Sequence, residues 1–217
     1  MLPRFTFLAI VVLALSACSR FGQPEDDSLE QALWAKQQSM AAAVTQWNLY
    51  ARGALRLEGE AYTIGIRWQR YDDSRFTMLI EAPFGQGVLR IETIAAGQYR
   101  LRLPNGQTYE NTTVEALLDD AVGWSLPISG LDYWVRGLPH PETIYSHRLD
   151  SAGRAKSIRQ DDWDIDYVEY FEVVSEPELP RRISLTNQTA TLKLVIERWQ
   201  QVPTPASSDA ELFPSFN

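Results

Sequence analysis

Apolar and polar residues alternate with a period of two through most of this chain, starting near Ala51. In the first run, Ala51, Gly53 and Leu55 alternate with Arg52 and Arg56. Because successive side chains of a β-strand point to opposite faces, such runs predict strands with one apolar face and one charged face. Similar runs occur at residues 62–69, 76–80, 89–92, 98–103, 108–109, 146–150, 155–159, 162–167, 183–185 and 192–196.

The connections between these runs are short and contain turn residues, for example at residues 58–60 and 104–107. Such turns join antiparallel strands, since parallel strands need a crossover of about a dozen or more residues. We therefore expect a mainly β domain with a helical lid. Its single, strongly curved antiparallel sheet of about eleven strands would form an unclosed β-barrel around an apolar interior.

Helical periodicity replaces the strand pattern in three places. A first helix is predicted to begin at Asp27 or Ser28 and to run to about residue 47. A second is predicted over residues 114–122, capped by Thr112 or Thr113, and a third segment opens at Pro127 and ends before residue 137. We expect the helices to cover the open side of the curved sheet.

The apolar face of the sheet borders either a packed core or a cavity. Seven Trp, nine Tyr and eight Phe among 217 residues fit both possibilities. A period of two identifies the face of a strand, but it does not show whether the space beside that face is filled. The residues predicted to face inward, and to line an acyl-chain cavity if there is one, are Leu55, Ile64, Ile66, Trp68, Met78, Ile80, Leu89, Ile91, Leu101 and Trp134.

The N-terminal residues 1–17 have the pattern of a secretory signal peptide. Arg4 precedes an apolar run that ends at Leu15, and this run is shorter than the roughly 20 residues needed to span a bilayer. Small residues then lead to Cys18, the only cysteine of the chain. The sequence Leu-Ser-Ala-Cys resembles the bacterial lipobox, which implies that Cys18 becomes acylated; an ordinary signal peptide with an incidental cysteine is the alternative.

The polar residues 18–27 are predicted to form a flexible tether between the lipid anchor and a domain of residues 28–201. Ser19 follows the cysteine, and serine at this position resembles the lipoproteins that reach the outer membrane rather than those retained in the inner membrane. We expect a single domain, a monomer anchored to the periplasmic face of the outer membrane. Residues 202–217 are rich in proline and are predicted to be disordered.

The sequence shows no arrangement of residues typical of catalysis or of metal or cofactor binding. His140 and His147 are the only histidines, and neither has ligands at metal-site spacing. The acids of residues 161–166 alternate with apolar residues, so we interpret them as the solvated face of a strand rather than a calcium loop. No phosphate-binding loop occurs, and a net charge of -8 argues against nucleic acid. We expect a protein that is not an enzyme and has no cofactor.

A turn at Pro83-Phe84-Gly85 places an aromatic ring at its tip. In so tight a turn the ring of Phe84 has little room to fold back under its own strand. One interpretation is that Phe84 covers a neighbouring loop or a helix end. The other is that it inserts into an apolar partner or a lipid surface, where one buried ring contributes roughly 1.5–3 kcal/mol.

Several motifs of the chain resemble the LolB family of outer-membrane lipoproteins. They are Arg52-Gly53-Ala54-Leu55, the Pro83-Phe84-Gly85 turn, and residues 123–128 (GWSLPI) and 131–139 (LDYWVRGLP). The similarity extends from the first helix to Trp199, and the last two motifs are its most specific part. The family has an exposed apolar residue, often leucine, where this chain has Phe84.

The resemblance implies an unclosed β-barrel with a helical lid and an apolar cavity. It also implies a receptor that accepts lipoproteins from the periplasmic carrier LolA and inserts them into the outer membrane, with the loop at Phe84 contacting outer-membrane lipid. Moving acyl chains through water costs on the order of 0.8 kcal/mol per methylene, so such a receptor needs a continuous apolar path. Without ATP, transfer would run from a weaker to a stronger binding site. The alternative is a structural lipoprotein with a filled core. A third possibility, a lipid-processing hydrolase, is disfavoured because the sequence shows no catalytic triad.

Overall fold

A computed structural model of the chain describes residues 25–57, 59–81, 87–123, 126–172 and 177–201. Helix α2 (Glu25–Ala42) precedes six strands, β1 (Trp47–Leu57), β2 (Glu60–Arg70), β3 (Phe76–Glu81), β4 (Val88–Ala95), β5 (Gln98–Arg102) and β6 (Thr108–Asn111). Helices α3 (Val114–Val122) and α4 (Ile128–Trp134) follow. The chain then forms β7 (Tyr145–Leu149), β8 (Ala155–Gln160), β9 (Trp163–Tyr170), β10 (Pro180–Thr186) and β11 (Ala190–Gln201).

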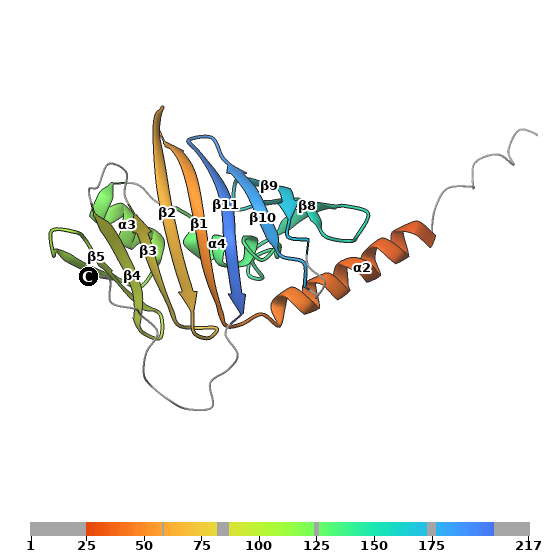
Figure 1. Ribbon diagram of the computed structural model, residues 1–217, viewed down its shortest axis with the longest axis horizontal. Coiled ribbons are helices and arrows are strands. Elements are labelled where there is room, and N and C mark those ends of the chain that lie inside the picture. Colours follow the sequence, from red (N-terminus) through yellow and green to blue (C-terminus); the bar gives the residue numbers. More distant parts are fainter. Residues whose placement is uncertain (1–24, 58, 82–86, 124–125, 173–176, 202–217) are drawn as a thin grey trace, which may run out of the picture.

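The eleven strands form one antiparallel sheet in the order β6-β5-β4-β3-β2-β1-β11-β10-β9-β8-β7. Strands β6 and β7 are the two edges, so the barrel is not closed, as the sequence predicts. The first and last strands in chain order, β1 and β11, pair in the middle of the sheet over eleven residue pairs from Trp47↔Gln201 to Leu57↔Ala190. This pairing joins the two halves of the chain at the centre of the curve (Figure 1).

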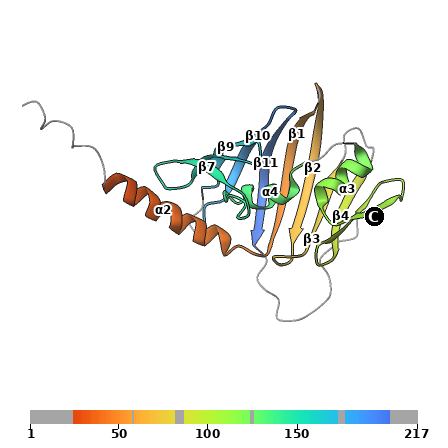
Figure 2. The ribbon, with the colours of Figure 1, turned by 180° about the vertical axis from the view of Figure 1, so that it is seen from behind.

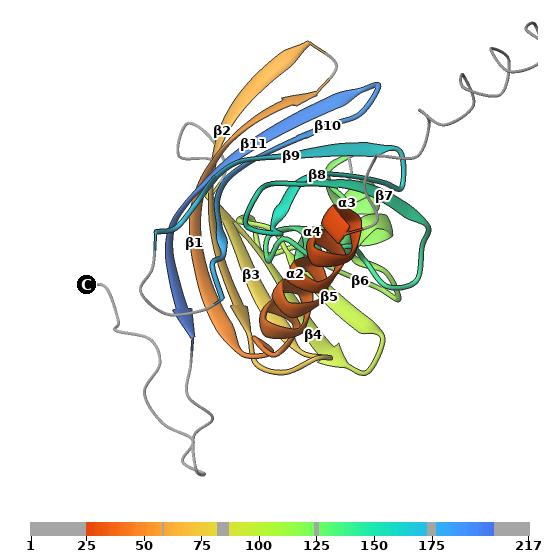
Figure 3. The same cartoon turned by 90° about the vertical axis from the view of Figure 1, so that its right-hand side faces the viewer.

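The sheet curves around α2, α3 and α4, which all lie on its concave side (Figure 3). Seen from behind, α3 and α4 lie in front of the strands (Figure 2). Gly53 occupies an inward position of β1, where a Cβ atom would lie 2.9 Å from Leu194 and 3.0 Å from Ile64. Because glycine has no side chain, Ile64 of β2 and Leu194 of β11 fill the space above Gly53.

The two helices of the connection between β6 and β7 match the sequence prediction closely. Thr113 is the N-cap of α3, and its hydroxyl accepts a hydrogen bond from the backbone N–H of Ala116 at 3.3 Å. Gly123 ends the helix in the left-handed conformation, with φ of 77°. Helix α4 starts directly after Pro127.

The prediction for the first helix is wrong at its C-terminal end. Helix α2 begins at Glu25 and ends at Ala42, and Trp47 is the first residue of β1. Trp47 is fully buried opposite Arg70 of β2, so sheet pairing and burial take this residue out of the apparent helical period. On α2, Leu29 is exposed, whereas Trp34 and Ala41 are buried.

Candidate functional site

The concave face of the sheet carries a continuous apolar layer that α4 covers. Ile128, Leu131 and Trp134 of α4, with the flanking Leu126 and Val135, are all at most 2% exposed. They belong to the same buried cluster as the inward side chains of β1, β2, β3 and β11. Burying one such side chain completely contributes roughly 1.5–3 kcal/mol, so this layer is a main source of the stability of the fold. We call α4 the lid.

The space between the lid and the sheet is filled. Its void has a volume of about 10 Å³. This is room for roughly one water molecule at most, so no acyl chain fits unless the lid moves. The void is bordered by Leu49, Ile66, Trp68, Met78, Ile80 and Leu194 of the sheet and by Leu126, Ile128, Leu131 and Val135 from the lid side.

All ten residues predicted to face inward are buried. Ile66, Trp68, Met78 and Ile80 border the void beneath the lid. The other six, Leu55, Ile64, Leu89, Ile91, Leu101 and Trp134, lie in the same buried cluster. Their inward direction agrees with the sequence pattern, and their role as the lining of an acyl-chain cavity stays a prediction.

A buried charged cluster joins the lid to the sheet. Asp132 of the lid lies against Arg70, the last residue of β2, and its Oδ2 atom accepts a hydrogen bond from the Arg70 guanidinium. Arg136 donates from Nε to the Asp132 carbonyl at 3.0 Å and from Nη1 to the Val44 carbonyl at 3.3 Å. Burial and then the positive charge of Arg136 lower the pKa of Arg70 from its ordinary value.

A second set of polar contacts holds the C-terminal end of the lid. The indole of Trp134 donates to Oε1 of Gln160 at 2.9 Å, and the hydroxyl of Tyr167 donates to the Trp134 carbonyl at 3.0 Å. Burial raises the pKa of Tyr167 well above 10, so this hydroxyl keeps its proton and remains a donor. Gln160 in turn donates to the backbone carbonyls of His140 and Thr143 at 2.8 and 3.0 Å.

The N-terminal end of the lid is bound to α3 through Glu115. Its carboxylate accepts a hydrogen bond from the backbone N–H of Ser129 at 2.8 Å and from the Ser129 hydroxyl at 3.2 Å. A carboxylate at a helix N-terminus satisfies backbone N–H groups that lack a partner within the helix. The lid therefore has specific polar contacts at both ends and an apolar face between them.

These polar contacts of the lid are not predicted from the sequence. The sequence pattern does indicate that Arg70 is buried, because it follows Ile64, Ile66 and Trp68 at the same spacing of two and so lies on the same inward face of β2. A buried charge needs a partner, so a charged residue on an apolar face indicates an ion pair across the core. The partner, Asp132, could not be identified because it lies 62 residues away on a helix whose placement the sequence does not determine.

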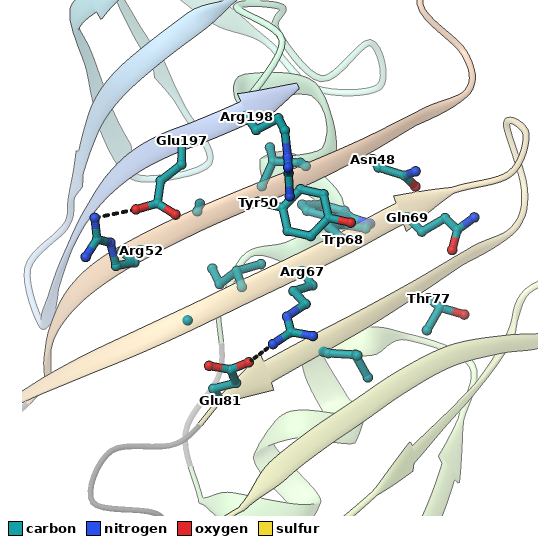
Figure 4. Close-up of a pocket in the computed structure, with 15 residues that line it drawn as sticks. Asn48, Tyr50, Arg52, Arg67, Trp68, Gln69, Thr77, Glu81, Glu197 and Arg198 are labelled. Carbon is teal, nitrogen blue, oxygen red and sulfur yellow. Dashed lines mark hydrogen bonds and ion pairs between the residues drawn. The ribbon is translucent and has the colours of Figure 1, made fainter. Parts of the chain in front are cut away.

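A second, larger hollow of about 670 Å³ lies on the outer face of the sheet (Figure 4). Outward side chains of β1, β2, β3 and β11 line it, and its charges are mostly paired. Arg52 is paired with Glu197, Arg67 lies 2.7 Å from Glu81, and the Arg198 guanidinium lies 4.2 Å from the centre of the Tyr50 ring. The sequence predicts a charged outer face but gives no sign of a hollow there.

The described residues contain no group of three or more His, Cys, Asp and Glu side chains that could hold a metal ion. His147 is exposed but lies on β7, stacked 5.2 Å from the ring of Trp34, and His140 is half-buried beside Tyr133 at 4.9 Å. On β9, Trp163, Ile165 and Tyr167 are buried and the aspartates between them are exposed, as predicted. None of the described helices is long and apolar enough to cross a membrane.

Two predicted sites, the lipidation site Cys18 and the loop at Pro83, Phe84 and Gly85, lie outside the described residues. The same holds for the signal peptide at residues 1–17 and for the tail at 202–217. These sites stay predictions.

An unclosed antiparallel barrel whose concave face is covered by a helical lid defines a class of proteins represented among solved structures. A LolA superfamily protein from Nitrosomonas europaea has this fold, with a TM-score of 0.50 at 11% identity over 81% of this chain and 94% of that protein. At this level of identity, the similarity concerns the fold alone.

The chain belongs to the LolB family: the profile described as "Outer membrane lipoprotein LolB" matches residues 45–199. A relative from Nitrosococcus oceani, named outer-membrane lipoprotein LolB, is 33% identical over 91% of this chain and 97% of its own length. A relative of the same name from Chromohalobacter salexigens is 34% identical over 89% of this chain and 89% of its own length. Another, from Marinobacter nauticus, is 31% identical over 93% of this chain and 99% of its own length.

Proposed function

We propose that this protein is an outer-membrane lipoprotein receptor, which takes acylated lipoproteins from the periplasmic carrier LolA and inserts them into the outer membrane without ATP. The membership of the LolB family supports this function. The single structural observation that carries it is the continuous apolar layer between the sheet and the lid. The lid is held to the sheet by polar contacts of Asp132 and Trp134.

Acyl chains would enter by displacing the lid. The void beneath the lid is about 10 Å³, so the chains must replace the contacts between the lid and β2, β3 and β11. Each displaced apolar side chain would be covered by acyl carbon instead of water, so the hydrophobic free energy of the layer is largely retained. The polar contacts of Asp132, Trp134 and Ser129 are then the cost of opening.

Two regions outside the described residues would complete the mechanism. An acylated Cys18 would anchor the protein. The tether would be residues 18–24 rather than 18–27, because α2 begins at Glu25 and is part of the receptor domain. Phe84, between Pro83 and Gly85, would insert into the bilayer and pass the cargo on. A single ring contributes roughly 1.5–3 kcal/mol, enough for a repeated contact and too little for an anchor.

Transfer of a labelled lipoprotein from purified LolA tests the proposal. With liposomes and no nucleotide, the wild-type protein is expected to remove the cargo from the carrier and deliver it to lipid. Phe84→Glu is expected to remove the cargo but not to deliver it, and normal delivery by this variant would contradict the role of Phe84. If the wild-type protein leaves the cargo on the carrier, the receptor function is wrong.

The filled space beneath the lid favours one alternative, a structural outer-membrane lipoprotein with a permanent core. Such a protein would not take up lipid. Failure of the purified protein to bind a fluorescent fatty acid, together with failure to accept cargo, would support it.

A further inference from the structure

Three buried N–H groups on the concave face of the sheet have no hydrogen-bond acceptor among the described residues. They are Nε1 of Trp47, Nε1 of Trp68 and Nε of Arg70, from residues that are 0%, 3% and 8% exposed. Buried donors nearly always have a partner, because leaving one unpaired forfeits the hydrogen bond that water would provide. Three such groups in one place therefore need an explanation.

The three residues are neighbours. Trp47 of β1 pairs with Arg70 of β2, and Trp68 precedes Arg70 by two residues on the same face. The rings of Trp47 and Trp68 lie 5.1 Å apart in an edge-to-face arrangement. We call Trp47, Trp68 and Arg70 the donor cluster.

The donor cluster adjoins the apolar layer beneath the lid. Trp68 borders the void there together with Met78 and Ile80. On the lid side, Oδ1 of Asp132 is also buried without a donor among the described residues, while its Oδ2 atom is bound by Arg70. Three donors and one acceptor that lack partners in the described part of the chain thus lie beside the void, and the other residues that border the void are apolar.

This arrangement suits a neutral ligand better than an anion. Two of the three donors are indole N–H groups, which carry no charge. Burying a carboxylate or phosphate costs much more hydration free energy than burying a neutral carbonyl. Ester and amide carbonyls are neutral acceptors that match these donors.

We propose that the donor cluster binds the ester and amide carbonyl oxygens at the head of an acylated glyceryl-cysteine, with the acyl chains lying along Trp68, Met78 and Ile80 after the lid has moved. This inference rests on the proposed receptor function and adds a polar recognition step to it. Phospholipids carry the same glycerol-ester carbonyls, so the chemistry recognised is the ester-linked glycerol, whichever lipid supplies it.

A comparison of ester and ether ligands tests the inference without altering the protein. The probe is a fluorescent synthetic peptide that starts with N-palmitoyl-S-(dipalmitoylglyceryl)cysteine, and its partner has the same chains in ether linkage. Each hydrogen bond to a carbonyl contributes about a 3- to 10-fold gain in affinity. The full-length wild-type protein is expected to bind the ester probe about 10-fold or more tightly than the ether probe.

Variants assign this preference to the donor cluster. Trp47→Phe and Trp68→Phe keep a ring and remove one N–H each, so each is expected to reduce the ester preference about 3- to 10-fold. Trp199→Phe is the matched control, because its indole N–H already donates to the Pro180 carbonyl at 3.2 Å and its ring also lies 5.1 Å from Trp47. This variant is expected to keep the ester preference.

The outcomes separate the two levels of the proposal. Equal binding of ester and ether probes by the wild-type protein, or an unchanged preference in both Trp variants, would overturn the role of the donor cluster and leave the receptor function standing. Absence of binding of either probe would contradict the receptor function itself. Dioleoylphosphatidylethanolamine and its ether analogue form a second arm: an ester preference confined to this lipid would overturn the assignment to the acylated cysteine.

Discussion

Removal of the Asp132 carboxylate is expected to release the lid from the sheet. Its side chain is only 11% exposed and lies between two buried guanidinium groups, with Oδ2 bound by Arg70 and 3.9 Å from Nη2 of Arg136. Asp132→Ala would leave both positive charges buried and facing each other. Breaking a buried ion pair on one side costs about 3–5 kcal/mol, because the remaining charge is uncompensated.

The loss is expected to concentrate in the lid, because the apolar contacts of the central strands remain. Hydrogen exchange measured by mass spectrometry should show residues 128–138 exchanging about 100-fold or more faster, since 1.4 kcal/mol corresponds to a factor of ten. Strands β1 and β11 should keep most of their protection. The double variant Arg70→Met with Asp132→Ala should be less destabilised than the sum of the single variants by about 1–3 kcal/mol.

Asp164→Ala is the matched control, since Asp164 also pairs with an arginine, Arg159, but both side chains are more than half exposed. We expect little change in its unfolding curve or in lid exchange. If Asp132→Ala costs less than about 1 kcal/mol in urea denaturation and leaves exchange at residues 128–138 unchanged, the ion pair does not hold the lid.

Three further changes test other parts of the fold. Thr113→Ala removes the N-cap of α3 and is expected to lower the free energy of unfolding by about 1 kcal/mol, whereas Thr113→Ser should retain most of it in urea denaturation. Gly130→Ala places a Cβ atom 2.6 Å from the Trp134 ring, so we expect a loss of about 1–3 kcal/mol and faster exchange in the lid. Burial raises the pKa of Asp150, but hydrogen bonds from Arg154 and from the Ala152 backbone outweigh burial and lower it below 3.8. Because the pKa of Asp150 is lower in the folded than in the unfolded protein, its carboxylate stabilises the fold above pH 3.8, and this stability is lost as the pH falls through the folded-state pKa. The difference in unfolding free energy between wild type and Asp150→Asn should therefore shrink in acid titrations below about pH 4. A difference that stays constant through this range would contradict the effect.

Local patterns determined the strands and the two short helices. Alternation placed Ile64, Ile66 and Trp68 on one face of β2, and the cap at Thr113 and the left-handed Gly123 fixed both ends of α3. These features depend on neighbours within a few residues, so the sequence carries them directly. The helix prediction failed at Trp47 because a weak helical period continues past Ala42, where pairing with β2 and β11 decides the structure.

The sequence by itself determined that this protein is a curved antiparallel sheet with one apolar face, and its motifs indicated the LolB family. Only the tertiary structure decided what lies against that face. The lid fills the space, Asp132 contacts Arg70, which lies 62 residues away, and the N–H donors of Trp47 and Trp68 have no acceptor in the part of the chain that the structure describes. The physical reason is that period two gives the direction of a side chain, whereas packing and hydrogen-bond partners depend on which distant segment meets it.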